Sequence, residues 1–393
     1  MAIRPDGAAE TVMNTPIGFA VRANDGEARM GRLVTAHGTI TTPCFMPVGT
    51  RAAVKAMAPD ELRGMGYRMV LANAYHLAVR PGPELVNQMG GIARFMGFEG
   101  AILTDSGGYQ AMSLAAINSI TEEGIRFRSH LDGAPILFTP ENTVALQERL
   151  GADIMMALDE CTPYPADRQR AQTSLELTAR WAERCVKSRN SASQALFGIV
   201  QGSIYPDLRR TSAAQITALP FDGYAVGGLS VGEPRPAMRE IAALTVGLLT
   251  AGNPRYLMGV GTPQDLLAAV AIGFDMFDCV LPTRNARNGS VFTSEGRLSI
   301  KRAQFTRDER PLDPRCDCRP CTTFSRAYLR HLYMSGEILA ARALTEHNLY
   351  FYARLMREAQ AAIVSGNYRT YAAYLINAMG GEDASNGTEL DVV

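Results

Sequence analysis

The chain has 393 residues, long enough for one large barrel or for two to three ordinary domains. Hydrophobic residues make up 47% and charged residues 20%, as in an ordinary soluble enzyme, and no run of 18 apolar residues predicts a membrane-spanning helix. Because the formal net charge is zero, the chain as a whole lacks the basic excess that is typical of nucleic-acid-binding proteins.

Eight short runs rich in β-forming residues alternate along the chain with helical segments. The runs are Cys44–Val48, Arg68–Asn73, Ala101–Asp105, Asp153–Leu158, Leu196–Val200, Gly223–Val226, Arg255–Met258 and Asp275–Cys279. Two helix starts are clear, because Thr139 and Thr262 each precede a proline and an acidic first turn. Further helices are expected at Arg168–Arg189 and Gly336–Gly366. This alternation predicts an α/β fold, a parallel (β/α)8 or TIM barrel.

The residues that end these runs are more informative than the runs themselves. Each run stops at a glycine or a polar residue, namely Gly49, Asn73, Asp105, Asp159, Gln201, Gly227, Gly259 and Asp278. A TIM barrel builds its active site from the carboxyl ends of its strands, although turns there use glycine in any case. The carboxylates at three different strand ends therefore predict an active site that contains Asp105, Asp159 and Asp278.

A second group of residues, near the C-terminus, has the spacing of a metal site. Cys316, Cys318 and Cys321 form a C-x-C-x2-C motif, and a histidine, His347, follows after 25 residues. Three thiolates and one imidazole complete the tetrahedral coordination of Zn2+, so we expect one structural zinc ion per chain. A disulfide or free thiols are the alternative, and His331 competes with His347 for the fourth position by spacing alone.

The expected organisation follows from these motifs. A catalytic barrel at residues 13–379 contains a zinc-binding subdomain at residues 290–350, inserted after the last barrel strand. Tails at residues 1–12 and 380–393 are rich in glycine, alanine and acidic residues and are expected to be disordered. The seven cysteines are odd in number, four of them are scattered, and no secretory leader is visible, which favours a cytoplasmic location.

The charge is unevenly distributed although it sums to zero. Between Arg284 and Arg330, eleven basic residues stand against five acidic ones, a local excess of six positive charges. Such an excess can bind phosphate groups, so this stretch is a candidate nucleic-acid-binding surface. A solvated basic face is the simpler alternative.

The residue types at the strand ends fit a pocket for a flat heterocycle. Asp105 and Asp278 can divide the roles of nucleophile and proton-transfer group. Asp159 can accept hydrogen bonds from an N–H and NH2 edge such as that of guanine, while Gln201 and the Gly228 backbone N–H can donate to a carbonyl oxygen. The side chains able to sandwich a flat ring are Tyr109 and Met258.

Four long motifs and the metal-site spacing resemble those of tRNA-guanine transglycosylases of the bacterial type. The motifs are Asp105–Gln110, Asp159–Tyr164, Gly227–Glu233 and Phe277–Arg284. They stand in the order that the family shows, and the resemblance extends from about Gly18 to Tyr371. Several long motifs in one order are far more specific than a single short pattern.

The resemblance implies base exchange on tRNA in queuosine biosynthesis. The family replaces the wobble guanine of tRNAs with a G-U-N anticodon by a 7-deazaguanine. By carry-over, Asp278 is the nucleophile at ribose C1′ in a covalent intermediate and Asp105 is the general acid and base, as in a retaining glycosidase. The residues that would hold the base and ribose are Ser106, Gly107, Gly108, Tyr109, Asp159, Cys161, Gln201, Gly228, Leu229 and Met258.

The resemblance also implies two RNA-binding segments and a homodimer as the working assembly. The segments are Gly259, Val260, Gly261, Thr262, Pro263, Gln264 and Asp265, which would touch the RNA backbone, and Thr283, Arg284, Asn285, Ala286 and Arg287. Arg284 and Arg287 would read the nucleotides beside the wobble base. Close relatives carry lysine where this chain has Thr262, so RNA affinity would rest more on Arg302, Arg326 and Arg330.

Other function classes fit less well. A metal-dependent barrel hydrolase needs clustered ligands, whereas the five histidines are scattered along the chain. A non-catalytic RNA-binding subunit, which the family contains, would not need both Asp105 and Asp278. Archaeal-type enzymes carry additional RNA-binding domains, and eukaryotic-type enzymes that use queuine tend to have glycine where this chain has Val231. The valine implies a smaller incoming base, 7-aminomethyl-7-deazaguanine.

Overall fold

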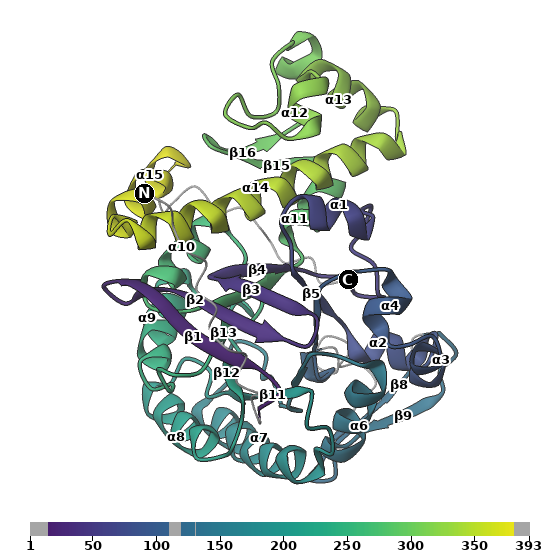
Figure 1. The fold of residues 1–393 in the computed structure, drawn as a ribbon, viewed down its shortest axis with the longest axis vertical. Coiled ribbons are helices and arrows are strands. Elements are labelled where there is room, and N and C mark those ends of the chain that lie inside the picture. The colour runs from purple at the N-terminus through teal and green to yellow at the C-terminus, as the bar shows by residue number, and fades with distance from the viewer. Residues whose placement is uncertain (1–14, 110–118, 130, 381–393) are drawn as a thin grey trace, which may run out of the picture.

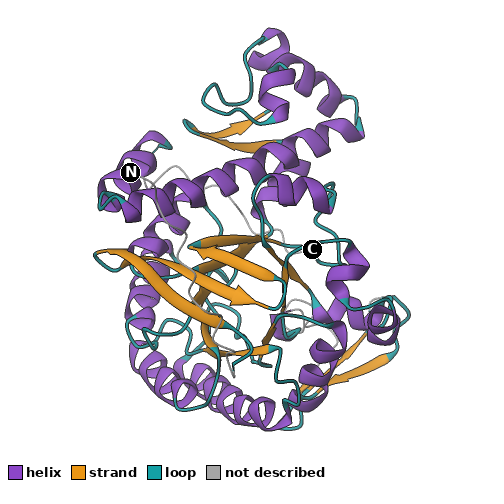
Figure 2. Cartoon of the chain, in the orientation of Figure 1, coloured by secondary structure: helices purple, strands orange, loops and turns teal. Residues whose placement is uncertain are grey.

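The computed structural model describes residues 15–109, 119–129 and 131–380. The tail predicted for residues 1–12, all but the first residue of the tail predicted for 380–393, and Gln110 of the first motif lie outside the described residues. Within the described part, a ring of parallel strands is surrounded by helices, as Figure 2 shows. No helix in these ranges combines the length and the apolar character needed to cross a membrane.

Eight strands of the described chain form the ring. They are β4 (Cys44–Pro47), β5 (Met69–Ala72), β6 (Ala101–Thr104), β10 (Ile154–Met156), β11 (Ala195–Val200), β12 (Gly223–Val226), β13 (Arg255–Leu257) and β14 (Met276–Cys279). Neighbours pair in the order β5-β6-β10-β11-β12-β13-β14-β4. The ring closes where Val48 forms a parallel bridge with Leu71 and the Gly49 N–H donates to the Leu71 carbonyl at 2.6 Å. The predicted TIM barrel is thus confirmed, with every strand end within two residues of its predicted position.

Helices follow the strands and cover the outside of the ring (Figure 1). They are α1 (Pro59–Gly64), α2 (Ala74–Val79), α3 (Pro83–Gln88), α4 (Ile92–Met96), α6 (Pro140–Leu150), α7 (Arg168–Ser188), α8 (Pro206–Thr217), α9 (Arg235–Val246), α10 (Pro263–Ala271), α14 (Ile338–Val364) and α15 (Tyr368–Ala378). The predicted helix starts are confirmed, since the Thr139 and Thr262 hydroxyls accept the N–H groups of Asn142 and Asp265, each at 3.2 Å.

Alternate residues of each strand face opposite sides of the ring, as the period of two in a β-strand requires. One set fills the interior, including Met46, Leu71, Met156 and Tyr256, and all of these side chains are buried. The other set packs against the helices. The interior of the barrel is therefore a packed core rather than a channel, and each large apolar side chain buried there contributes roughly 1.5–3 kcal/mol.

A three-stranded antiparallel sheet, which the sequence analysis did not predict, covers the N-terminal end of the barrel. Its strands are β1 (Gly18–Asp25), β2 (Ala28–Thr35) and β3 (Gly38–Thr42). Leu33 and Ile40 extend the interior core. Arg29 donates to Asp275, just before β14, at 2.8 Å. Because this sheet closes one end, the opposite end, where the strands terminate, is the one available for a site (Figure 1).

A second unpredicted sheet lies between β6 and α6. It is antiparallel and consists of β7 (Ser119–Ile120), β8 (Ile125–Arg128) and β9 (Pro135–Phe138). Phe127 and Phe138 pack edge to face with ring centroids 5.0 Å apart, and both rings also contact Tyr75 of α2. This sheet therefore packs beside the carboxyl ends of β5 and β6.

The segment after β14 forms a lobe beside the barrel, at the top of Figure 1. It contains α11 (Leu281–Arg287), β15 (Ser290–Thr293), β16 (Gly296–Ser299), a 3-10 helix η2 (Ala303–Arg307), α12 (Arg319–Thr323) and α13 (Arg326–Met334). The lobe has its own apolar cluster, which includes Val291, Leu312 and Leu344. Helix α14 runs unbroken from this lobe onto the barrel, so the predicted subdomain boundary at residue 350 falls inside a helix.

Candidate active site and metal centre

Asp278 stands at the end of β14, half-buried, with a carboxylate held by two donors. The Tyr256 hydroxyl donates to Oδ1 at 2.6 Å and the Gly259 N–H donates to the same oxygen at 2.8 Å. Burial raises the pKa of Asp278, and these two hydrogen bonds act in the opposite direction. Both donors bind Oδ1, so Oδ2 is the oxygen suited to attack an electrophile.

Asp105 follows β6 and is held in a similar way from the neighbouring strand. The Ala74 N–H donates to Oδ1 at 2.9 Å, and the Asn73 side-chain amide donates to Oδ2. Both carboxylates lie close enough to Tyr256 to influence its hydroxyl. Burial raises the pKa of Tyr256 most, the charge of Asp278 raises it further, and the charge of Asp105 adds a smaller contribution. The barrel thus brings together two carboxylates that the sequence places on separate strands.

Asp159, at the end of β10, is the third carboxylate and is buried. The Gln201 side-chain amide donates to Oδ2 at 2.6 Å and the Ser106 hydroxyl to Oδ1 at 3.3 Å. Burial raises the pKa of Asp159 to about 6, against the effect of these two donors. Asp159 therefore changes its protonation state not far below neutral pH, and both the protonated acid and the carboxylate can interact with a polar ligand.

Three glycines leave the space that this arrangement needs. A Cβ at Gly108 would lie 2.5 Å from the Asp159 carbonyl oxygen. A Cβ at Gly227 or Gly228 would lie 2.7 Å or 2.3 Å from the Gln201 amide, and Gly228 has φ of +64°. Side chains at these positions would displace Gln201 and Asp159, so the glycines allow the backbone to approach the polar groups closely.

The other residues predicted for the base pocket surround the same strand ends. Tyr109 is 53% exposed, which leaves its ring accessible, and Met258 is half-buried beside the barrel core. Burial raises the pKa of Tyr109, and the charges of Cys161 and Asp278 act in the same direction. Leu229 and Cys161 are buried, and burial raises the pKa of the Cys161 thiol, so Cys161 is not an activated nucleophile. The ligand contacts of these residues stay a prediction.

The sequence analysis missed several residues that support the carboxylates. Tyr256 is an interior residue of β13, and nothing in its local pattern indicates that its hydroxyl reaches Asp278. Asn73 was noted only as a strand end. Arg209, on α8, is fully buried and donates to the carbonyl oxygens of Val200 and Gly227, each at 2.9 Å. A buried arginine in a helix cannot be recognised from sequence when its partners are backbone atoms.

The two predicted RNA-binding segments differ in exposure. In the first, Gly259 is exposed and Thr262 is half-buried, while the other five residues are buried. Thr262 caps α10, and its hydroxyl also bonds to Asp265, which pairs with Arg235 at 2.9 Å. In the second segment, on α11, Arg287 is exposed and Arg284 is half-buried, while Thr283, Asn285 and Ala286 are buried. RNA contact stays a prediction for both segments.

The structure corrects the suggested role of Arg326 as a phosphate anchor. Arg326 is 6% exposed, donates to the Leu312 carbonyl at 2.9 Å and pairs with Asp308 at 3.3 Å. Its guanidinium also lies over the Phe305 ring, 5.4 Å from the centroid. Arg326 therefore holds the lobe together. Arg302, which is exposed, and Arg330, which is half-buried, remain candidates for phosphate contact.

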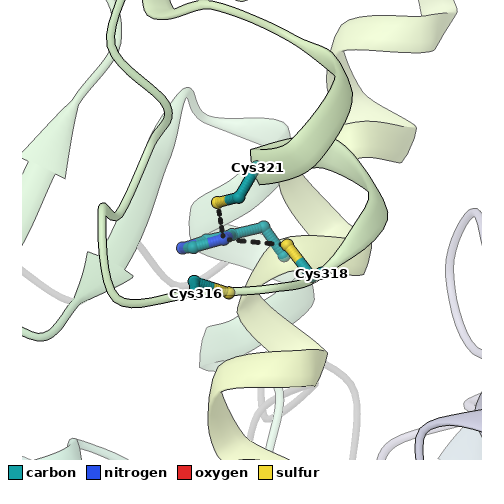
Figure 3. Close-up of side chains that lie close together, drawn as sticks. Cys316, Cys318 and Cys321 are labelled. Carbon is teal, nitrogen blue, oxygen red and sulfur yellow. Dashed lines mark hydrogen bonds between the residues drawn. The ribbon is translucent and has the colours of Figure 1, made fainter.

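The predicted metal ligands converge in the lobe. One potential ligand atom from each of Cys316, Cys318, Cys321 and His347 lies within 4.8 Å of the others, and all four residues are buried. His347 Nδ1 lies 3.5 Å from the Cys318 sulfur and 3.3 Å from the Cys321 sulfur. Figure 3 shows the three cysteine side chains pointing toward one another. Three sulfurs and one nitrogen in this arrangement can bind one metal ion.

The surroundings of His347 fit the role of a ligand. Its Nε2 lies 2.8 Å from the Phe292 carbonyl oxygen, so that nitrogen carries the proton and Nδ1 presents a lone pair to the sulfurs. His331, the competing candidate, lies exposed on α13 and is not part of the cluster. The position of His347 beside the three sulfurs therefore identifies it as the fourth ligand, which sequence spacing alone could not do.

The chain is similar in sequence to known proteins over most of its length. The profile of the family described as Queuine tRNA-ribosyltransferase matches residues 24–380. A queuine tRNA-ribosyltransferase from Solidesulfovibrio magneticus is 55% identical, over 92% of this chain and 97% of its own length. Relatives of the same name from Nitratidesulfovibrio vulgaris and Caldanaerobacter subterraneus are 54% and 55% identical, over 91% and 86% of this chain and 96% and 90% of their own lengths.

We predict that loss of one ligand releases the metal and destabilises the lobe. The purified wild-type chain should contain one metal ion by elemental analysis, and Cys318→Ser should contain none and unfold at a lower temperature, because metal binding is coupled to folding. His331→Ala is the matched control and should keep the metal. A metal-free Cys318→Ser protein with wild-type thermal stability, or loss of metal in His331→Ala, would contradict this assignment.

Proposed function

The chain belongs to the queuine tRNA-ribosyltransferase family, and we propose that its barrel replaces the wobble guanine of G-U-N anticodon tRNAs through a covalent aspartyl-ribose intermediate. Membership confirms the predicted family and makes the chain a tRNA-guanine transglycosylase, a pentosyltransferase of queuosine synthesis. The observation that carries the proposed mechanism is the pair of supported carboxylates, Asp278 and Asp105, at one end of the barrel.

The first half of the exchange breaks the bond between the ribose and guanine. One oxygen of Asp278 attacks C1′ as the glycosidic bond breaks, and the electron pair of that bond goes to the base. Tyr256 and the Gly259 N–H hold Oδ1, which leaves Oδ2 to form the ester. Asp105 gives a proton to the leaving guanine as general acid.

The second half reverses these steps with a different base. The incoming 7-deazaguanine attacks C1′, the ester to Asp278 breaks, and Asp105 takes up the proton that this base loses. The Asn73 amide and the Ala74 N–H stabilise the ionised form of Asp105 from which this second step proceeds. The proton given in the first half is regained in the second, so the exchange consumes none.

Recognition of the base would rest on the network around Asp159. Its carboxylate accepts hydrogen bonds from the N–H and NH2 edge of guanine, while Gln201 and the Gly228 N–H donate to the carbonyl oxygen. Tyr109 and Met258 would cover the two faces of the ring. The same edge is present in guanine and in 7-deazaguanines, so one pocket can serve both half-reactions. The half-buried Val231 supports a small substituent, and hence 7-aminomethyl-7-deazaguanine, as the incoming base.

The target nucleotide must leave its stack to reach the strand ends, and a tRNA is much larger than one barrel mouth. Arg284 and Arg287 lie on α11, which starts only two residues after the end of β14, the strand that carries the proposed nucleophile. We therefore infer that they read neighbouring nucleotides, with Gly259 and Thr262 at the backbone. A homodimer, in which the second chain supports the tRNA without catalysing, completes the proposed assembly.

The ion that fits the lobe best is zinc. Three thiolates and one imidazole are a closed tetrahedral set, typical of structural rather than catalytic zinc sites. All four residues belong to the lobe or to α14, and none of the three site carboxylates is among them. The proposed zinc would therefore stabilise the lobe and take no part in the exchange.

We predict that Asp278→Asn abolishes both exchange and the covalent adduct. Wild-type protein should incorporate labelled guanine into unmodified tRNA at the wobble position and form a tRNA adduct that survives denaturation. Asp278→Asn should lower incorporation by several orders of magnitude and leave no adduct, because an amide is a poor nucleophile, while tRNA still binds.

Cys279→Ala is the control for Asp278→Asn, because burial raises the pKa of the neighbouring thiol to about 12 and so keeps it unreactive. This variant should retain the adduct. An adduct that persists in Asp278→Asn but disappears in Asp105→Asn would show that the two carboxylates have the opposite roles.

We predict that affinity for guanine falls as the pH drops through about 6. The pKa of Asp159 is raised by burial to about 6, and the protonated acid accepts fewer hydrogen bonds from the base. Since this folded-state pKa lies above the unfolded value, protonation of Asp159 favours the folded state as the pH falls. Weaker binding at pH 5 would therefore not reflect unfolding caused by this group.

The measurement is guanine affinity by calorimetry between pH 5 and pH 8. Asp159→Asn is the matched variant and should bind weakly without this pH dependence, because the amide does not titrate in the range. A wild-type affinity that stays constant across pH 6, with a folded protein throughout, would show that Asp159 does not bind guanine as a carboxylate.

We predict different effects for the two exposed arginines Arg287 and Arg302. Arg287→Ala should reduce, by roughly 1–3 kcal/mol, the preference for the natural tRNA over tRNAs altered beside the wobble base, since base-edge contacts specify sequence. Arg302→Ala should lower the affinity for every tRNA alike. It should also reduce the slope of log affinity against log salt concentration by about one, since phosphate contacts release counterions. Sequence-independent losses in both variants would make Arg287 a phosphate contact.

A further inference from the structure

We propose that Arg209 is a positioning residue for the base exchange, which aims the Gly228 N–H into the base pocket and strengthens it as a donor to the carbonyl oxygen of the leaving base. The inference rests on the proposed function of the pocket. Arg209 lies on α8, outside every motif that the sequence analysis identified, and its side chain is fully buried.

The guanidinium of Arg209 lies behind the pocket and binds backbone oxygens. Nη1 donates to the carbonyls of Val200 and Gly227, each at 2.9 Å, and Nε donates to the Ser203 carbonyl at 2.8 Å. Nη2 lies 3.4 Å from the Gly228 carbonyl. Val200 ends β11 and Gly227 follows β12, so one side chain joins the ends of two adjacent barrel strands.

The Gly227 contact determines where the next N–H points. In a trans peptide the C=O of one residue and the N–H of the next point in opposite directions. The Gly227 oxygen faces Arg209, so the Gly228 N–H faces away from Arg209. That N–H acts to lower the pKa of the Cys161 thiol, against the effect of burial, so it faces the side of the pocket on which Cys161 lies. A thiol sulfur is only a weak acceptor, so a ligand carbonyl is the better partner for this N–H.

The charge of Arg209 acts in the same direction. The positively charged guanidinium that donates to the Gly227 oxygen polarises this peptide group and makes the Gly228 N–H a stronger donor. When the glycosidic bond breaks, its electron pair goes to the base, and conjugation places part of the negative charge on the carbonyl oxygen. A polarised donor aimed there stabilises the transition state more than the ground state.

Burial of this charge is costly, which argues for a specific role. Desolvation lowers the pKa of Arg209 to about 10, and within the described chain its guanidinium donates to carbonyl oxygens rather than to a carboxylate. Gly202 allows the close approach, because a Cβ there would lie 2.9 Å from the Arg209 backbone nitrogen. An apolar side chain in α8 would avoid the cost of desolvation but would remove the donor that Arg209 supplies to the carbonyls of Ser203 and Gly227.

The test compares two purines that differ in the group that the Gly228 N–H would bind. Guanine has a carbonyl oxygen at C6 and 2-aminopurine has none. Arg209→Lys keeps the charge but loses the fork of donors, so its affinity for guanine should fall roughly threefold to tenfold relative to that for 2-aminopurine. Guanine release from tRNA should slow as well. Arg210 is the exposed neighbour of Arg209 on α8, so Arg210→Lys is the matched control. It should change neither the relative affinity for guanine nor the rate of guanine release.

Equal losses for both purines in a folded Arg209→Lys protein would assign Arg209 a merely structural role and overturn the inference. If the variant does not fold, a crystal structure of the wild-type protein with guanine decides the question. The Gly228 N–H should then contact the guanine oxygen while the Gly227 oxygen stays on Arg209, and separation of Gly227 from Arg209 would also overturn the inference. A wild-type protein that neither binds guanine nor exchanges it would instead contradict the proposed function.

Discussion

The closed ring of parallel strands is the constraint on which the site depends. Parallel pairing gives all eight strands one direction, and the contact between Val48 and Leu71 brings the first two barrel strands together. All carboxyl ends therefore meet on one side, while the β1–β3 sheet covers the other. Asp105, Asp159 and Asp278 are distant in sequence, yet each ends its strand at the same rim. The site needs no long loop to assemble it.

The support behind the three carboxylates explains how they tolerate burial. An unpaired buried carboxylate would take up a proton rather than remain charged. Asp278 accepts hydrogen bonds from Tyr256 and Gly259, and Asp105 from Asn73 and Ala74, and these neutral donors favour the ionised form of each carboxylate. At Asp159, as at Asp278, burial outweighs the two donors and raises the pKa, to about 6 for Asp159. Asp278 and Asp159 thus share this balance of burial against neutral donors, although their proposed roles differ.

Local patterns predicted the barrel strands, the helix starts and the cysteines of the metal site, because these features depend on neighbours in sequence. The β1–β3 sheet was missed because its pairing with the barrel end depends on tertiary contacts such as Arg29 with Asp275. The same limit applies to the buried arginines. Nothing in the local sequence distinguishes Arg326, which is enclosed by Asp308 and Leu312, from the exposed Arg302.

Helix α14 connects the metal centre to the catalytic end of the barrel through consecutive residues. His347 belongs to the metal cluster, and the next residue, Asn348, accepts the Phe292 N–H at 3.0 Å and donates to the Pro282 carbonyl at 2.9 Å. Pro282 lies in α11, directly after the strand that carries Asp278. One turn further along, the Tyr352 hydroxyl donates to the Gly261 carbonyl in the segment that follows β13. An ion that orders this stretch of α14 therefore also stabilises the two segments proposed to contact RNA, although it lies outside the group of carboxylates.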